Sequence, residues 1–195
     1  MNLVTAKSDA LIKRIESEGK SSPADILITV DAGRLDRAKK MDLLQPLSNL
    51  PVIKKIPKNY IDKDNKWIAL SKRIRTIIFS KENKKNNDIK NFEDLANNEW
   101  SKRICVRSSN NIYNQSLVAS LIANQGEKNA EKLIKRVVEN FARKPSGNDR
   151  AQIKAVAKND CDIAIVNHYY YAIMLKSKDV AQRKAADLER GFGGV

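Results

Sequence analysis

The chain has 195 residues, of which 42% are hydrophobic, and a formal net charge of +14. This length and apolar content suit a folded protein of one domain or two small lobes and argue against wholesale disorder. The apolar runs are too short to span a membrane. The charge favours anionic partners, but the basic residues are scattered and no DNA- or RNA-binding motif is recognisable, so we expect no nucleic-acid partner.

The first part of the chain predicts two helices and two strands. Ser8 is a candidate cap for a helix with one apolar face, and a second helix is predicted from 31 to about 40. Residues 24–30 read ADILITV and predict a buried strand. After a proline-containing connection, residues 67–79 predict a longer strand with an interruption in its middle. The lysine- and asparagine-rich stretch 80–90 predicts an exposed linker at a border between lobes.

Strands and helices also alternate in the second part of the chain. Strands are predicted at 103–107 and from Cys161, with helices after 114–116, at 132–141 and at 150–158. This alternation predicts an α/β fold with largely parallel pairing. The charged, helix-prone end of the chain predicts no further strand.

Tyrosines follow two of these predicted strands at the point where each strand ends. Tyr113 follows the first, and Tyr169, Tyr170 and Tyr171 follow the second. Ligands bind beside the carboxyl ends of strands in open α/β sheets. A free phenol titrates near pH ~10, so a strongly Lewis-acidic ion such as Fe³⁺ is needed to convert tyrosines into hard anionic ligands. The pattern therefore indicates a candidate site for ferric iron.

The competing interpretation is a packed aromatic helix start, with the hydroxyls of Tyr169, Tyr170 and Tyr171 bonded to the backbone. Neighbouring residues point roughly 100° apart in a helix, so Tyr169 and Tyr170 are expected to reach one metal only from an irregular strand-to-helix turn. Asn167 and His168 favour such a turn. His168 is the only histidine, and no acid or nucleophile in the sequence pairs with it, so we predict that the chain is not an enzyme.

The turn at 108–111 and two arginines are further candidates. Backbone N–H groups of the turn, which contains Ser108 and Asn110, can hold a small synergistic anion or support Tyr113. Arg73 and Arg75 share one face of a regular strand. For Arg73, a role facing the metal or an anion and a place on an exposed basic edge are equally supported, whereas the exposed edge is favoured for Arg75.

Cys105 and Cys161 each stand at the start of a predicted strand. If these strands are parallel neighbours, the two thiols lie close enough for a disulfide, which fits an oxidising compartment. Two buried free thiols are an equally supported alternative. The wide spacing does not suit a zinc site.

Four segments resemble the ferric-iron substrate-binding proteins of ABC transporters, particularly those of cyanobacteria. They are 24–33 (ADILITVDAG), 71–76 (SKRIRT), 106–116 (VRSSNNIYNQS) and 166–170 (VNHYY). The resemblance implies a periplasmic-binding-protein-like two-lobe fold with open, mostly parallel sheets. It also implies a monomeric periplasmic protein whose lobes close on Fe³⁺ and deliver it to the membrane permease of an ABC importer.

The resemblance assigns roles to individual residues. Tyr113, Tyr169 and Tyr170 match the tyrosine ligands of the family, and Arg73 matches an arginine of the other lobe that balances the phenolate charge. With the residue-based interpretation above, Ser108 and Asn110 are placed beside the ligands, as support for Tyr113 or for an anion.

The resemblance also suggests domain boundaries. We expect a partial N-terminal lobe at 1–79, a C-terminal lobe with the tyrosine cluster at 80–176, and a charged helical tail at 177–195 that is an incomplete return to the first lobe. Family members carry an earlier strand with a further tyrosine ligand and continue beyond the tyrosine helix, so we expect a chain truncated at both ends and without a signal peptide. Two alternatives remain, a remnant that does not bind iron tightly and a basic module that binds anions or nucleic acid.

Overall fold

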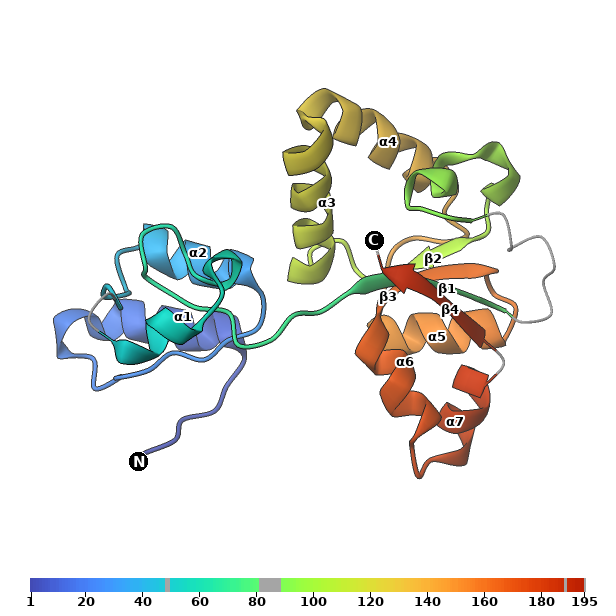
Figure 1. Cartoon of the computed structure of the whole chain (residues 1–195). Coiled ribbons are helices and arrows are strands. Elements are labelled where there is room, and N and C mark those ends of the chain that lie inside the picture. Colours follow the sequence, from blue (N-terminus) through green and yellow to red (C-terminus); the bar gives the residue numbers. More distant parts are fainter. Residues whose placement is uncertain (48–49, 81–88, 188, 195) are drawn as a thin grey trace. The chain divides into compact units, whose positions relative to one another are not determined.

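The computed structural model of the protein describes residues 1–47, 50–80, 89–187 and 189–194 (Figure 1). The chain forms two compact units, Met1–Lys72 and Arg73–Val195. This division lies earlier than the predicted border after residue 79, because Arg75–Ser80 is a strand in the sheet of the second unit. Most of the predicted linker, residues 81–88, lies outside the described residues.

The first unit contains two helices, α1 (Ser8–Glu18) and α2 (Ala32–Lys40), close to the predicted positions. Asp31 caps α2, since its side chain accepts a hydrogen bond from the backbone N–H of Gly33. Short 3-10 helices complete the regular structure of the described part of this unit: η1 (Gly19–Ser21), η2 (Pro51–Lys55) and η3 (Lys58–Tyr60). Among the described residues of this unit, Ile12 and Ala38 are the buried apolar side chains.

The predicted buried strand at 24–30 is wrong. The segment belongs to no strand, and Ile26 and Ile28 are 78% and 73% exposed. A strand forms only when its backbone bonds to a neighbouring strand, and none of the described strands pairs with this segment. The prediction at 67–79 is correct only in its second half, where β1 begins at Arg75.

The second unit is built on one mixed sheet of four described strands, ordered β2-β3-β1-β4. They are β1 (Arg75–Ser80), β2 (Ile104–Val106), β3 (Ile163–Asn167) and β4 (Glu189–Gly194). β2 and β3 are parallel, as a helical crossover between them requires. β1 runs antiparallel to β3 and β4, so the sheet is mixed rather than mostly parallel.

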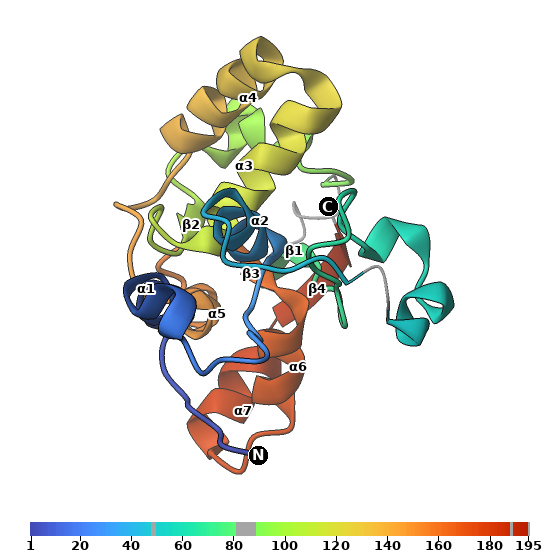
Figure 2. The same cartoon turned by 90° about the vertical axis from the view of Figure 1, so that its left-hand side faces the viewer.

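Helices cover both faces of this sheet (Figures 1 and 2). One face carries α3 (Ile112–Gln125) and α4 (Glu127–Glu139), with η5 (Glu93–Ala96) and η6 (Asn98–Trp100). The other carries α5 (Asp149–Ala157), α6 (His168–Leu175) and α7 (Val180–Asp187). These helices confirm the α/β class, and they pack on a sheet whose buried side chains alternate between the two faces.

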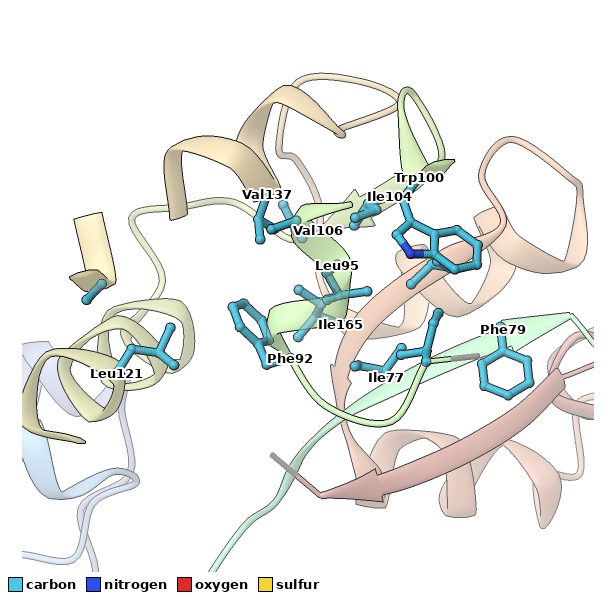
Figure 3. Packing of buried hydrophobic residues seen from close by; sticks show 14 residues of the cluster. Ile77, Phe79, Phe92, Leu95, Trp100, Ile104, Val106, Leu121, Val137 and Ile165 are labelled. Atoms are coloured by element: carbon cyan, nitrogen blue, oxygen red, sulfur yellow. The ribbon is translucent and has the colours of Figure 1, made fainter. Parts of the chain in front are cut away.

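The alternation in β1 separates two hydrophobic clusters. Ile77 and Phe79 join the first cluster, which contains Trp100 and Phe92 (Figure 3). Ile78 joins the second cluster, beneath α5, α6 and α7. Each face of the sheet therefore has its own core.

The tail differs from the prediction of an incomplete return to the first lobe. α7 packs against α5 and α6. β4 then pairs along one edge of β1, although no strand was predicted there. Both elements belong to the second compact unit.

A disulfide joins Cys105 and Cys161, whose Cα atoms lie 5.9 Å apart. It links the start of the parallel pair β2 and β3, and both residues are buried in the second cluster. The structure thus decides between the two alternatives that the sequence left open. Among the described helices, none is both long and apolar enough to cross a membrane.

Candidate metal centre

Tyr113 is fixed by the turn that leads from β2 into α3. Asn111 caps α3, and its side-chain oxygen accepts a hydrogen bond from the backbone N–H of Tyr113 at 3.0 Å. The Asn114 amide donates to the carbonyl oxygens of Arg107 at 3.1 Å and Ser108 at 3.3 Å. These bonds hold the turn against the first turn of α3, so the backbone of Tyr113 has a defined position.

Tyr169 and Tyr170 lie in the first turn of α6. Asn167 ends β3 and directly precedes the helix, which begins at His168. The strand therefore passes into α6 without the irregular turn that we predicted. The two rings still lie close together, with centroids 4.4 Å apart.

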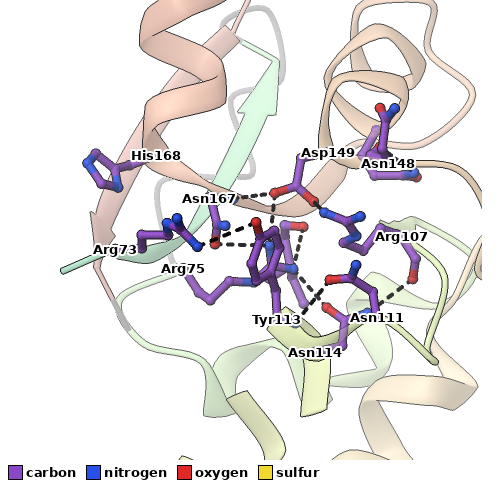
Figure 4. Close-up of polar contacts among 12 residues, drawn as sticks. Arg73, Arg75, Arg107, Asn111, Tyr113, Asn114, Asn148, Asp149, Asn167 and His168 are labelled. Atoms are coloured by element: carbon purple, nitrogen blue, oxygen red, sulfur yellow. Dashed lines mark hydrogen bonds and ion pairs between the residues drawn. The ribbon is translucent and has the colours of Figure 1, made fainter. Parts of the chain in front are cut away.

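The two tyrosine-bearing helix starts converge at their hydroxyl groups. The hydroxyl oxygens of Tyr113 and Tyr169 lie 3.5 Å apart. Arg73 Nη1 donates to the Tyr113 hydroxyl at 3.5 Å, and the guanidinium carbon lies 5.5 Å and 5.6 Å from the centroids of the Tyr113 and Tyr169 rings (Figure 4). Arg73 belongs to the same compact unit as the tyrosines, whereas the resemblance placed it in the other lobe.

Tyr169 holds its proton more firmly than a free phenol does, because its pKa is raised. Burial raises its pKa above the ordinary value, and hydrogen bonds with Tyr113 and Tyr170 raise the pKa further. The side chain of Asn167 acts in the opposite direction and favours the phenolate. A cation bound to this hydroxyl oxygen would have to displace the proton, which would couple its binding to proton release.

Tyr170 has two environments. Its hydrogen bond to Tyr169 contributes to the raised pKa of Tyr169, whereas its ring packs against the second hydrophobic cluster. The guanidinium carbon of Arg150 lies 5.1 Å from the ring centroid. Tyr171 packs against the same cluster, as expected for a core aromatic residue.

A buried network of charged side chains contacts the ring of Tyr113 through Arg107. Asp149 is fully buried and pairs with Arg75 and Arg107, which are each 9% exposed. Arg75 is thus not on the exposed basic edge that we favoured. The sequence feature that could have indicated burial of Arg75 is its position in the strand. Arg75 lies two residues before Ile77 and therefore on the same face as this core residue.

Asp149 and Arg107 were not predicted as site residues. An acid at a helix start is common on the protein surface, so the sequence does not distinguish Asp149 from an exposed residue. Arg107 is the last residue of the predicted strand 103–107, and its side chain stacks on the ring of Tyr113, with the guanidinium carbon 5.0 Å from the centroid. That contact depends on the turn geometry.

The remaining predicted residues lie at the rim of the cluster. The Ser108 hydroxyl donates to the side-chain oxygen of Asn110, and the backbone N–H of Ser108 donates to Gly147 O at 3.5 Å. His168 contacts the backbone of Ile74 through its Nδ1 and its own N–H. His168 therefore ties the start of α6 to the chain just before β1.

In the described part of the chain, no group of three or more His, Cys, Asp or Glu side chains could hold a metal ion. The hydroxyl oxygens of Tyr113 and Tyr169 do lie close together. Their arrangement suits a cation hard and acidic enough to bind phenolate.

The family model described as "Bacterial extracellular solute-binding protein" matches residues 21–186. "Iron uptake protein A1" of Synechocystis is 42% identical over 187 residues, which are 96% of this chain and 52% of that protein. This chain therefore spans about half the length of this curated relative.

Solved structures that are similar to the chain include the following two. One, from Trichodesmium, is described as a complex with iron and citrate ligands. Its TM-score is 0.93 and its sequence identity is 47%, and the match covers 98% of this chain and 60% of the Trichodesmium chain. The other is apo FutA2 from Synechocystis, with a TM-score of 0.94 and 42% sequence identity. This match covers 98% of this chain and 61% of the FutA2 chain.

Proposed function

Because the chain belongs to the family of bacterial extracellular solute-binding proteins, we propose that it provides tyrosine ligands for Fe³⁺ in the binding component of an ABC importer. Tyr113, Tyr169 and Tyr170 are the proposed ligands. The names of similar proteins, which refer to iron uptake and to bound iron, support this choice of ion.

The observation that carries the proposal is the 3.5 Å distance between the hydroxyl oxygens of Tyr113 and Tyr169. These oxygens come from the first turns of two helices, where the helix dipoles favour negative charge. Three phenolates offset the charge of one Fe³⁺. Arg73 is well placed to balance phenolate charge from the side of Tyr113.

We also propose the wider role that goes with this site. The protein acts outside the cytoplasm, as a monomer, and hands the ion to a permease without catalysing a reaction. The disulfide between Cys105 and Cys161 suits an oxidising compartment. The turn containing Ser108 and Asn110 is the proposed place for a small anion that completes the iron coordination.

Titration with ferric nitrilotriacetate tests the proposal. We expect a visible phenolate-to-iron charge-transfer band in the native chain and its loss in the Tyr169→Phe/Tyr170→Phe variant. Tyr60→Phe, in the first unit, is the matched control and should leave the band unchanged. A colourless native protein whose melting temperature does not change with iron would refute the proposal.

A further inference from the structure

We infer that Asp149 is a positioning residue for the tyrosine site and that Arg107 is a charge-balancing residue for Tyr113. The inference rests on the proposed function and deepens it. Neither residue is itself a proposed ligand: Asp149 begins α5, and Arg107 directly follows β2. We assign their role from the hydrogen bonds that join Asp149 to β1, to Arg107 and to β3.

The carboxylate of Asp149 accepts hydrogen bonds from one residue of β1, one residue of β3 and Arg107, which follows β2 (Figure 4). Oδ2 accepts from the backbone N–H of Asn167 at 2.9 Å and from Arg75 Nη1 at 3.1 Å. Oδ1 accepts from Arg107 Nη1 at 3.0 Å. Asp149 is 0% exposed, so water does not compete for these bonds, which are charge-assisted and hence strong.

One arm of the network holds the start of α6. Asn167, two residues before Tyr169, is bonded at its backbone by Asp149 and at its side-chain oxygen by Arg75 Nη1, at 3.3 Å. Two anchors on one residue restrict both the position and the rotation of the strand end. The direction in which Tyr169 leaves the helix therefore depends on Asp149.

The other arm holds the start of α3. Arg75 Nη2 donates to the side-chain oxygen of Asn114 at 2.8 Å, and Asn114 bonds back to the carbonyl oxygen of Arg107 at 3.1 Å. The guanidinium of Arg107 is held by Asp149 and stacks on the Tyr113 ring. Tyr113 is thus supported on its backbone side and on its ring.

The network also has a net charge. One carboxylate faces two guanidinium groups, so the buried cluster of Asp149, Arg75 and Arg107 carries one excess positive charge. Low-dielectric surroundings strengthen the effect of that charge on a nearby phenolate. Arg107 and Arg73 both stack against Tyr113, so a Tyr113 phenolate would have two cations close to it.

Removal of Asp149 should therefore affect iron binding and not only folding. In Asp149→Asn, both arginines lose their charged acceptor and the two helix starts lose their common anchor. Loss of a residue that orients a metal ligand typically lowers metal affinity about 10- to 100-fold. We expect a loss in this range, with a shift in the wavelength of the charge-transfer band as Tyr113 and Tyr169 change their geometry.

The test compares ferric nitrilotriacetate titrations of the native chain, Asp149→Asn, Arg107→Met and Arg107→Lys. Asp162→Asn is the matched control, because Asp162 also pairs with an arginine, Arg103. Asp162 directly precedes β3, whereas the tyrosines follow the other end of this strand. We expect reduced affinity and a shifted band for Asp149→Asn and Arg107→Met, partial rescue in Arg107→Lys, and native behaviour in the control.

The outcomes separate the inference from the proposed function. A native chain with no charge-transfer band overturns both. A native chain with the band, together with folded Asp149→Asn and Arg107→Met variants that keep native affinity and wavelength, overturns the inference alone. If Asp149→Asn does not fold, the two Arg107 variants decide, since Arg107→Met leaves Asp149 paired with Arg75. Equal affinity in Arg107→Met and the native chain then overturns the inference.

Discussion

Tyr113 and Tyr169 are 56 residues apart in the sequence, and their hydroxyl oxygens are 3.5 Å apart. Cys105 and Cys161 have the same separation of 56 residues and are joined by a disulfide. Each tyrosine thus follows its cysteine by the same number of residues, across β2 in one case and β3 in the other. The parallel strand pair therefore connects a covalent link at its start to the candidate site beyond its end.

This connection predicts that the disulfide supports both stability and the site. A disulfide that closes a loop of this length stabilises the folded chain by about 4 kcal/mol in the chain-entropy model. Cys105→Ser/Cys161→Ser should therefore lower the free energy of unfolding by up to about this amount, measured by urea denaturation, and should weaken iron binding. A double variant with native stability would contradict the prediction.

Iron binding should strengthen with increasing pH. Burial raises the pKa of Tyr169, so the metal-free protein keeps the proton that iron must displace. Affinity measured against a competing chelator should rise from pH 6 to pH 8, after correction for the pH dependence of the chelator. In weakly buffered solution, Tyr169→Phe should release one proton fewer per iron bound. Equal proton release in the native and variant proteins would exclude Tyr169 as a ligand.

The same shift affects the stability of the metal-free protein at alkaline pH. A raised pKa means that the folded state binds the Tyr169 proton more tightly than the unfolded state does. Stability should therefore be fully present below the unfolded pKa of about 10 and should fall as pH rises above it. Thermal unfolding between pH 8 and pH 11 should show a smaller alkaline loss in Tyr169→Phe than in the native chain. An equal loss would mean that Tyr169 does not cause the dependence.

The sequence was informative about the tyrosines because strand ends and tyrosines are both local features. Residues after β2 and β3 could be assigned to one edge of a sheet once the strands were predicted to be parallel. The buried partners of Asp149 were not predictable in this way. They lie in β1, directly after β2 and in β3, and only the folded packing shows that these residues meet.

The error at residues 24–30 has a different cause. Its apolar composition is typical of a buried strand, yet Ile26 and Ile28 are largely exposed and the segment pairs with none of the described strands. Local composition predicts whether a segment is able to form a strand, whereas pairing requires a second strand. β4 is the opposite case: a glycine-rich end with little strand propensity pairs with β1 because an edge is available.

The exposed segment predicts that the first unit binds hydrophobic probes. Ile26 and Ile28, two residues apart in the chain, are 78% and 73% exposed, and neighbouring exposed apolar groups bind such dyes. Nile red, which is uncharged, should fluoresce with the native chain and less with Ile26→Ser/Ile28→Ser. Val138→Ser, which removes a 49% exposed side chain from α4, is the control and should retain most of the signal. Because these substitutions change no charge, equal fluorescence in all three proteins would show that the segment at 24–30 is not the dye-binding surface.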